Sequence, residues 1–584
     1  MRPTTAHRSS ISPLISPIGR KAAATLVAGL LLTTAAWASP VGPAEASAAG
    51  STAGSPRPDA PAAGASGLDL DTVTIPQLQA RMERGSLTAV ALTRAYLERI
   101  KTVDPKIHAV LRTDPTALAQ AAASDVRHRR GTVRGPLDGI PVLIKDNVDT
   151  KGLLSTAGSL ALAGAPPRAD AELVTRLRKA GAVILGKTNL SEWANFRAAK
   201  PTSGWSAVGG QTRNPYVLDR NPCGSSAGSG AALAASLTQV AIGTETDGSI
   251  VCPAGMNGVV GLKPTLGVVS GRGVVPISAE QDTAGPMARN VVDVALTLAA
   301  LRGDTHGSAG PQKDRDVPNA AEEEPASAAR QTGAYGEQSA PDAADRLRGK
   351  RIGLWRLPSL GKEVDALMTR TAQRLRSAGA EVVEVTPPYQ ERLAELEFPA
   401  LLTEFHRDID AYLSGRQGPR DLAGLIAFNR AHEAERTCFA GQELFEQALA
   451  APPTTDPKYR AARAELKKLS RASIDDTLAA HRLDAIAAPT NPPAWTTDCA
   501  RGDNDVIPSS TPAAVAGYPS LSVPAGSVGE LPVGLLLMSG AHKDGALLSL
   551  GAAIEHRLQA WRTPRYLPTL PATGTPNDRG DNKH

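Results

Sequence analysis

The stretch AIGTETDGSIVCPAGMNGVVGLKPT, residues 241–265, decides the fold of this chain through the pattern around Ser249. The apolar run LTQVAIG (237–243) predicts a buried strand, and Ile-Val-Cys-Pro-Ala after Ser249 is typical of the early turns of a short helix. Ser249 would then lie at a strand-to-helix turn, where Gly248 lets the backbone approach a ligand closely. Such a turn predicts an oxyanion hole. Its candidate donors are the backbone N–H groups of Thr246, Asp247, Gly248 and Ser249.

Two other glycine-bracketed segments carry the groups that a serine nucleophile needs. GIPVLIKDNV (139–148) contains an apolar run that predicts a strand ending at Lys145, and PCGSSAGSG (222–230) contains Ser225 and Ser226. A neutral lysine can deprotonate a serine if burial lowers its pKa from about 10.4. Taken alone, Lys145 would more often be a surface residue, and GSSAGSG a turn before a helix at 227–237.

The segments taken together resemble the amidase signature hydrolases, and most closely the bacterial peptide amidase branch of that family. The resemblance covers roughly residues 70–560 and implies an α/β fold, one large domain with a mixed central sheet flanked by helices. The strand and helix patterns of residues 350–385 also favour α/β. Beyond 222–230 and 241–265, the similar stretches are NLSEWANFR (189–197), SGWSAVGGQTRNPY (203–216), QDTAGPMAR (281–289), LIAFNRAH (425–432), and AAVAGYPSLSVPAG with LPVGLLLM (513–538).

The resemblance also implies a catalytic Ser-cisSer-Lys triad, and an amidase that needs no cofactor or metal. In this family the first serine of the GSS element follows a cis peptide bond and precedes the nucleophile by 24 residues, as Ser225 precedes Ser249 here. Ser249 would be the nucleophile, Ser225 the bridging hydroxyl and Lys145 the base. Ser226 would be a supporting hydroxyl.

The substrate implied by the resemblance is an amidated peptide, deamidated at its C-terminus through an acyl-enzyme. A small aliphatic or aryl amide is the alternative, and an inactive extracellular binding protein on the same scaffold is a third. The broad family pattern is close to GTDTGGSIR, whereas this chain has Glu245, Asp247 and Val251, as the peptide amidase branch does. This difference predicts another charge pattern beside the nucleophile.

Three other motifs in the sequence match patterns of different functions. GAVILGKT (181–188) matches a phosphate loop, but a helical pattern precedes it and AVIL within it predicts a buried strand. GSSAG (224–228) matches the nucleophile elbow of α/β-hydrolases, which would make Ser226 the nucleophile, yet no downstream histidine lies in a segment that favours this. After His432-Glu433, Arg436 stands where a zinc site needs histidine.

The flanking segments predict where the enzyme works. Residues 1–38 have a basic start, an Ala/Leu-rich stretch and a cleavage-like Ala-Trp-Ala, which predict a signal peptide and a secreted protein without a membrane anchor. Low-complexity composition predicts a disordered tether at 39–66 and a surface insertion at 303–345. The amidase domain would span 67–564, and 565–584 would be a disordered tail.

Charge and cysteine content give weaker expectations. The chain has 63 Lys and Arg against 58 Asp and Glu without a basic block, so nucleic-acid binding is not predicted. Cys223 and Cys252 flank the candidate serines and are predicted to be small buried packing residues. Cys438 and Cys499 are expected at the surface, where an oxidising compartment would allow them to pair.

Overall fold

The computed structural model describes residues 67–302, 346–439, 441–503 and 509–571. The predicted signal peptide, the tether at 39–66 and the insertion at 303–345 lie outside these residues. The predicted tail boundary at 564 is wrong for the first residues beyond it. Leu567 forms a β-bridge with Val217 and its carbonyl accepts the Leu218 N–H at 2.7 Å, so backbone pairing holds this segment to the domain.

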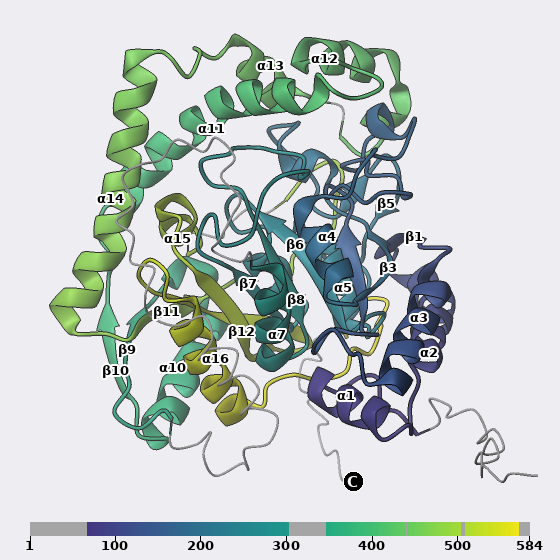
Figure 1. The fold of residues 1–584 in the computed structure, drawn as a ribbon. Coiled ribbons are helices and arrows are strands. Elements are labelled where there is room, and N and C mark those ends of the chain that lie inside the picture. The colour runs from purple at the N-terminus through teal and green to yellow at the C-terminus, as the bar shows by residue number, and fades with distance from the viewer. Residues whose placement is uncertain (1–66, 303–345, 440, 504–508, 572–584) are drawn as a thin grey trace, which may run out of the picture. The chain divides into compact units, whose positions relative to one another are not determined.

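An eleven-stranded mixed sheet forms the centre of the domain, in the order β1-β3-β2-β6-β8-β7-β12-β13-β11-β9-β10 (Figure 1). β2 pairs in parallel with β3 and β6, whereas β8 and β12 pair antiparallel with their neighbours. This mixed sheet confirms the predicted α/β class. The strands are β1 (Val110–Thr113), β2 (Pro141–Lys145), β3 (Val183–Thr188), β6 (Val240–Glu245), β7 (Val260–Lys263), β8 (Thr283–Ala288), β9 (Arg351–Trp355), β10 (Glu381–Val385), β11 (Ala485–Pro489), β12 (Ser520–Val528) and β13 (Leu531–Met538). Two short strands, β4 (Trp205–Ser206) and β5 (Gly210–Gln211), pair separately.

Helices surround the sheet (Figure 1). The first three helices of the chain lie toward the lower right of the view, whereas many of the later ones lie toward its left and top. The helices are α1 (Ile75–Glu83), α2 (Ala89–Val103), α3 (Ala117–Arg130), α4 (Glu172–Lys179), α5 (Ala227–Ala234), α6 (Val251–Met256), α7 (Val291–Leu301), α10 (Lys362–Ser377), α11 (Gln390–Leu413), α12 (Leu422–Ala431), α13 (Glu443–Ala450), α14 (Pro457–His481), α15 (Thr511–Ala516) and α16 (Asp544–Leu558). The predicted helix at 227–237 therefore forms, but ends three residues early.

Helices α11 to α14 form a layer of their own along the top and left of Figure 1. The apolar sides of α11, α12 and α13 meet in a second hydrophobic cluster, in which the rings of Phe405 and Phe445 stack with centroids 5.3 Å apart. This layer also reaches toward the sheet, because α11 and α14 both pack against α15. Side chains of this helical layer can therefore contact loops that follow strands of the sheet.

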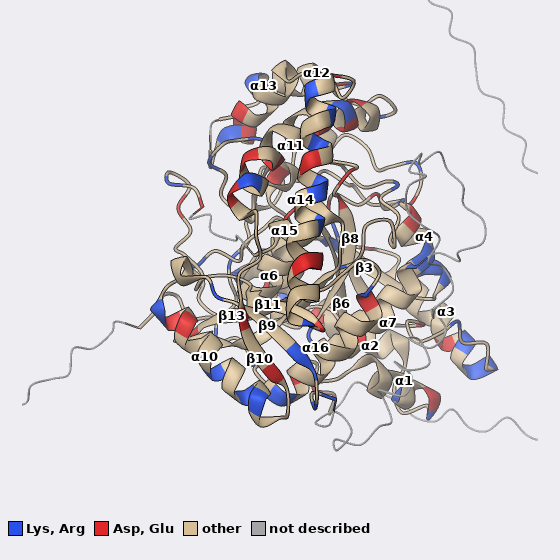
Figure 2. Cartoon of the chain, turned by 90° about the vertical axis from the view of Figure 1, so that its left-hand side faces the viewer, with Lys and Arg blue, Asp and Glu red and all other residues tan. Residues whose placement is uncertain are grey.

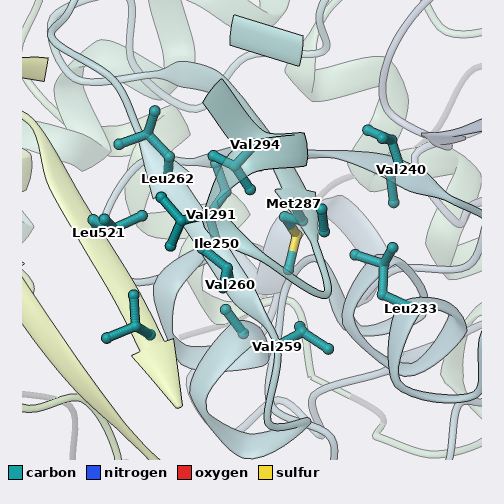
Figure 3. Close-up of a cluster of buried hydrophobic side chains, with 14 of the residues drawn as sticks. Leu233, Val240, Ile250, Val259, Val260, Leu262, Met287, Val291, Val294 and Leu521 are labelled. Carbon is teal, nitrogen blue, oxygen red and sulfur yellow. The ribbon is translucent and has the colours of Figure 1, made fainter. Parts of the chain in front are cut away.

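The main core runs through the middle strands, which are buried on both faces. Figure 3 shows Ile250 and Met287 within one cluster of apolar side chains, and both are fully buried. Ile250 follows Ser249 directly, so the core holds the residue next to the candidate nucleophile. Burying a side chain of this size stabilises the fold by about 2 kcal/mol.

Many charged residues lie on the outer helices, where Lys and Arg are interspersed with Asp and Glu (Figure 2). This pattern is typical of a solvated surface and shows no single-sign field on this face. Among the residues described, no helix combines the length and apolarity needed to cross a membrane.

Candidate active site

Lys145 is the last residue of β2 and its side chain is fully buried. β2 lies between β3 and β6, so the end of this strand faces the loop that follows β6. The ammonium nitrogen Nζ is 2.8 Å from Ser225 Oγ and 2.8 Å from Thr244 Oγ1. The apolar run before Lys145 therefore forms the predicted strand and carries the lysine to the first serine of the GSS element.

Burial changes the acidity of Lys145. Loss of hydration lowers its pKa from 10.5 to about 7, against the opposing charges of Glu245 and Asp282. A large fraction of Lys145 is then neutral near pH 7, and a neutral amine can accept a proton from a neighbouring hydroxyl. The surface-lysine alternative is wrong for this residue.

The GSS element is held by backbone and side-chain hydrogen bonds to the loops around it. The Gly224–Ser225 peptide bond is cis, as the family resemblance implied. The Ser226 N–H donates to the Ser249 carbonyl oxygen at 3.1 Å, which places the two serine segments side by side. Ser226 Oγ donates to the Thr244 carbonyl at 3.1 Å and accepts the Thr244 N–H at 3.2 Å. These bonds tie the GSS element to the backbone of β6.

Ser249 lies in the turn between β6 and α6, as the sequence predicted. The residue is partly exposed, in contrast to the fully buried Ser225 and Ser226. Gly248 has φ +79°, a left-handed conformation that glycine adopts at little cost. Ser249 is thus the most exposed of the three serines, and the N–H groups of residues 246–249 follow one another along this turn.

Glu245 fixes the geometry of this turn, a role that the sequence did not reveal. Its Oε2 accepts the N–H groups of Ile250 at 2.7 Å and Val251 at 3.0 Å. The carboxylate therefore satisfies donors at the start of α6, as an acidic residue at a helix N-terminus does. An acidic residue shortly before a predicted helix could have indicated such a cap. The sequence did not show, however, that the loop folds back to bring Glu245 to the start of α6.

The sequence also showed no sign of a role for Thr244, which lies on β6, or for Asp282, which directly precedes β8. Both contact residues of the candidate site. The Thr244 hydroxyl oxygen accepts from Asn147 Nδ2 at 2.9 Å as well as from Lys145. Thr246 Oγ1 donates to Asp282 Oδ1 at 2.5 Å, and burial raises the pKa of Asp282 to about 7. These residues hold the lysine and the turn, and their contacts come from different strands.

Cys223 and Cys252 are buried, as predicted. They are joined by a disulfide, however, so the prediction that they are only packing residues is wrong. Their Cα atoms are 6.0 Å apart across a separation of 29 residues. Cys223 precedes the GSS element and Cys252 belongs to α6, so the contact between Ser226 and Ser249 brings them together. Cys438 and Cys499 also form a disulfide, the pairing that an oxidising compartment would allow. Cys499 is exposed as expected, but the surface prediction is wrong for Cys438, which is buried against Phe439.

Removing the first disulfide with Cys223→Ala/Cys252→Ala is expected to lower the free energy of unfolding by about 3–4 kcal/mol, since the bridge closes a 29-residue loop. We also expect kcat to fall, because the bridge joins the two serine segments. Denaturant unfolding and steady-state kinetics would measure both. The matched control Cys438→Ala/Cys499→Ala should lose stability without losing kcat, and equal kcat in all three proteins would contradict the link to the site.

The phosphate-loop match at 181–188 folds as the sequence predicted. Residues 183–188 form β3, and Lys187 is buried, with Nζ 3.6 Å from Asp146 Oδ1. A lysine held inside an ion pair within a strand cannot present its charge to a phosphate. In the part of the chain that the structure describes, no group of three or more His, Cys, Asp or Glu side chains could hold a metal ion.

Comparison with known proteins identifies the family. A family model described as Amidase matches residues 91–548. A probable amidase from Arabidopsis thaliana is 36% identical over 513 residues, which cover 86% of this chain and 93% of that protein. The native peptide amidase of Stenotrophomonas maltophilia shares 48% identity with a TM-score of 0.75, covering 85% of this chain and 98% of the other.

A peptide amidase solved with the competitive inhibitor chymostatin also shares 48% identity, with a TM-score of 0.76 over 85% of this chain and 99% of the other. The family model's match, residues 91–548, includes the sheet, the GSS element and the turn that carries Ser249. They agree with the predicted resemblance to peptide amidases. The chain belongs to the amidase signature family and is a hydrolase that acts on amide C–N bonds.

Proposed function

We propose that this enzyme cleaves amides through Ser249 as nucleophile, Ser225 as relay and Lys145 as base. The observation that carries the proposal is the 2.8 Å contact between Lys145 Nζ and Ser225 Oγ, fully buried beside the turn of Ser249. Neutral Lys145 takes the Ser225 proton while Ser225 takes that of Ser249, whose Oγ bonds to the substrate carbonyl carbon. The N–H groups of residues 246–249 stabilise the oxyanion.

The second half of the reaction uses the same groups in reverse. The protonated relay delivers its proton to the leaving nitrogen as the C–N bond breaks, which releases ammonia or an amine and leaves an ester on Ser249. Water then gives a proton to the relay and its oxygen to the acyl carbon. The acid leaves and Ser249 regains its proton, so one base serves both halves.

The substrate we infer is a peptide with a C-terminal amide. Similarity to peptide amidases over 85% of the chain supports this class, as does the presence of Asp247 and Val251 in place of the wider family's residues. A small aliphatic or aryl amide is the second candidate. The filled triad positions argue against an inactive binding protein.

We further propose that the enzyme is secreted. Two observations support this: the signal-like pattern of residues 1–38, and two disulfides, which persist in oxidising compartments. The N-terminal residue and mass of protein recovered from the culture medium would test the proposal. Full-length protein retained inside the cell would contradict it.

Ammonia release from a panel of amidated dipeptides and tripeptides, compared with amine release from anilides and short aliphatic amides, tests the substrate. We expect the amidated peptides to have the highest kcat/KM, and Ser249→Ala to release nothing. Preferential turnover of anilides or short amides would replace the peptide proposal and keep the triad. Absence of hydrolysis of every amide by the folded enzyme would refute the catalytic proposal.

A further inference from the structure

Two carboxyl groups from distant parts of the chain meet beside the nucleophile turn. Asp247 lies two residues before Ser249, and its Oδ2 accepts a hydrogen bond from Thr511 Oγ1 at 2.6 Å, at the start of α15. The side chain of Asp247 also hydrogen-bonds the side chain of Glu397, which comes from α11 in the separate helical layer. The turn that carries the candidate oxyanion hole is thus attached to helices outside the sheet.

A hydrogen bond between two carboxyl groups requires that one of them hold a proton. Glu397 is 9% exposed, and its Oε1 accepts from Gln281 Nε2 at 2.8 Å. Burial and the charge of Asp247 raise the pKa of Glu397 well above its usual value, against the pull of Arg463. Glu397 is therefore the protonated partner, and its O–H donates to Asp247.

The charged groups around this pair leave Glu397 without a full counter-charge. Arg463 of α14 is the cation near it, but Arg463 Nε lies 3.2 Å from Glu404 Oε1, and its Nη1 donates to Gln281 Oε1 at 2.7 Å. On the side of the turn, Glu245 of β6 and Lys263 of β7 both interact electrostatically with Asp247. Ionisation of Glu397 would then place two like charges in contact.

Gln281 connects the pair to the beginning of the turn. Its Nε2 lies 3.4 Å from the Thr246 carbonyl oxygen, in addition to its bond to Glu397. Thr246 and Asp247 are the first two residues of the candidate oxyanion hole. A shift of Glu397 would therefore be transmitted to the backbone that carries the N–H donors.

We propose that Glu397 is a positioning residue: as a neutral acid it hydrogen-bonds Asp247 and holds the 246–249 turn in its active shape, and its ionisation releases that turn at alkaline pH. This inference deepens the proposed function and rests on it. Glu397 does not take part in proton transfer. It acts through the turn, where the loss of one well-placed oxyanion donor lowers kcat by about 10²- to 10³-fold.

The test compares the pH dependence of kcat in wild type, Glu397→Gln and Glu397→Ala, with any amide that the wild type hydrolyses. Glutamine keeps a neutral hydrogen-bond donor of the same shape and cannot ionise. We expect Glu397→Gln to keep kcat within about threefold at neutral pH and to lose the alkaline fall in activity, and Glu397→Ala to lose at least about tenfold in kcat with little change in KM. The acid limb, which depends on Lys145, should be the same in all three.

Glu404→Gln is the matched control, since Glu404 is a buried glutamate on the same helix that contacts Arg463 rather than the turn. It should keep an alkaline limb, moved to lower pH, because Arg463 is then free to lower the pKa of Glu397. An unchanged alkaline limb in Glu397→Gln, or a wild-type kcat in Glu397→Ala, would overturn the inference. So would a Glu397→Gln protein that is folded but as inactive as Glu397→Ala. Any of these three outcomes would overturn the role of Glu397 and leave the proposed function intact. Full activity of Ser249→Ala would instead refute the proposed function.

Thermal unfolding across the same pH range provides a readout independent of activity. Because the folded pKa of Glu397 is raised, the carboxyl contributes most to stability below its unfolded pKa of 4.5, and this contribution is lost as the pH rises toward the folded pKa. The melting temperature of wild type should therefore fall more steeply with pH than that of Glu397→Gln. Parallel curves would contradict a protonated Glu397.

Discussion

Ser249→Ala is expected to lower kcat for amide hydrolysis by about 10⁴-fold or more, with no loss of folding, because it removes the atom that bonds to the acyl carbon. Ser249 is partly exposed and its side chain is not part of the core, so the melting temperature should stay within a few degrees of wild type. Initial rates with an amidated peptide, together with thermal unfolding, would measure both quantities.

Ser226→Ala is the matched control for this prediction, because the nucleophile-elbow alternative assigns the attack to Ser226. The Ser226 hydroxyl bridges the backbone N–H and carbonyl of Thr244, so its loss should destabilise the fold by about 1–3 kcal/mol and reduce activity only partly. An active Ser249→Ala protein beside an inactive Ser226→Ala protein would reverse the assignment of the nucleophile.

Lys145→Met is expected to lower kcat by a similarly large factor while leaving the protein as stable as wild type at pH 7, or more stable. The lysine is fully buried, and its pKa of about 7 shows that burial disfavours its charged form. Methionine fills much of the same volume without a charge to desolvate. Activity that falls as stability rises is typical of a residue kept for function.

The pH dependence of wild type follows from the same shift. Because the base must be neutral, kcat/KM should rise as the pH increases through about 7. In stability, the unfolded chain binds the Lys145 proton up to about 10.5 whereas the folded chain releases it near 7, so this residue makes stability rise with pH between those values. Lys145→Met should lack that rise, and an identical slope in both proteins would contradict the buried-lysine assignment.

Much of the site could be predicted because its chemistry is encoded in short segments. A five-residue apolar strand ending in Lys145 needs no distant information to place the lysine at the edge of a sheet. The glycine before Ser249 and the helix after it define the turn in the same local way. The family resemblance then assigned roles to three residues that local patterns alone left ambiguous.

The contacts that hold these segments together could not be predicted in this way. Thr244 is an ordinary strand residue in the sequence, and it gains a role only because β2 and β6 pair in parallel. The bond between Cys223 and Cys252 likewise depends on how two loops meet, and spacing alone cannot give a distance. The boundary of the tail at 564 failed because a single β-bridge to Val217 leaves no compositional signal.

By itself, the sequence determined the class of fold, the strand-to-helix turn of Ser249 and the residue types for serine-based amide hydrolysis, because strand periodicity, glycine and reactive side chains act over a few residues. Tertiary structure alone decided that Lys145 loses its water, that Glu245 holds the turn, and that Glu397 meets Asp247 from a helix about 150 residues away in the chain. Burial and charge contact depend on which segments pack together, and that packing sets the pKa values on which catalysis depends.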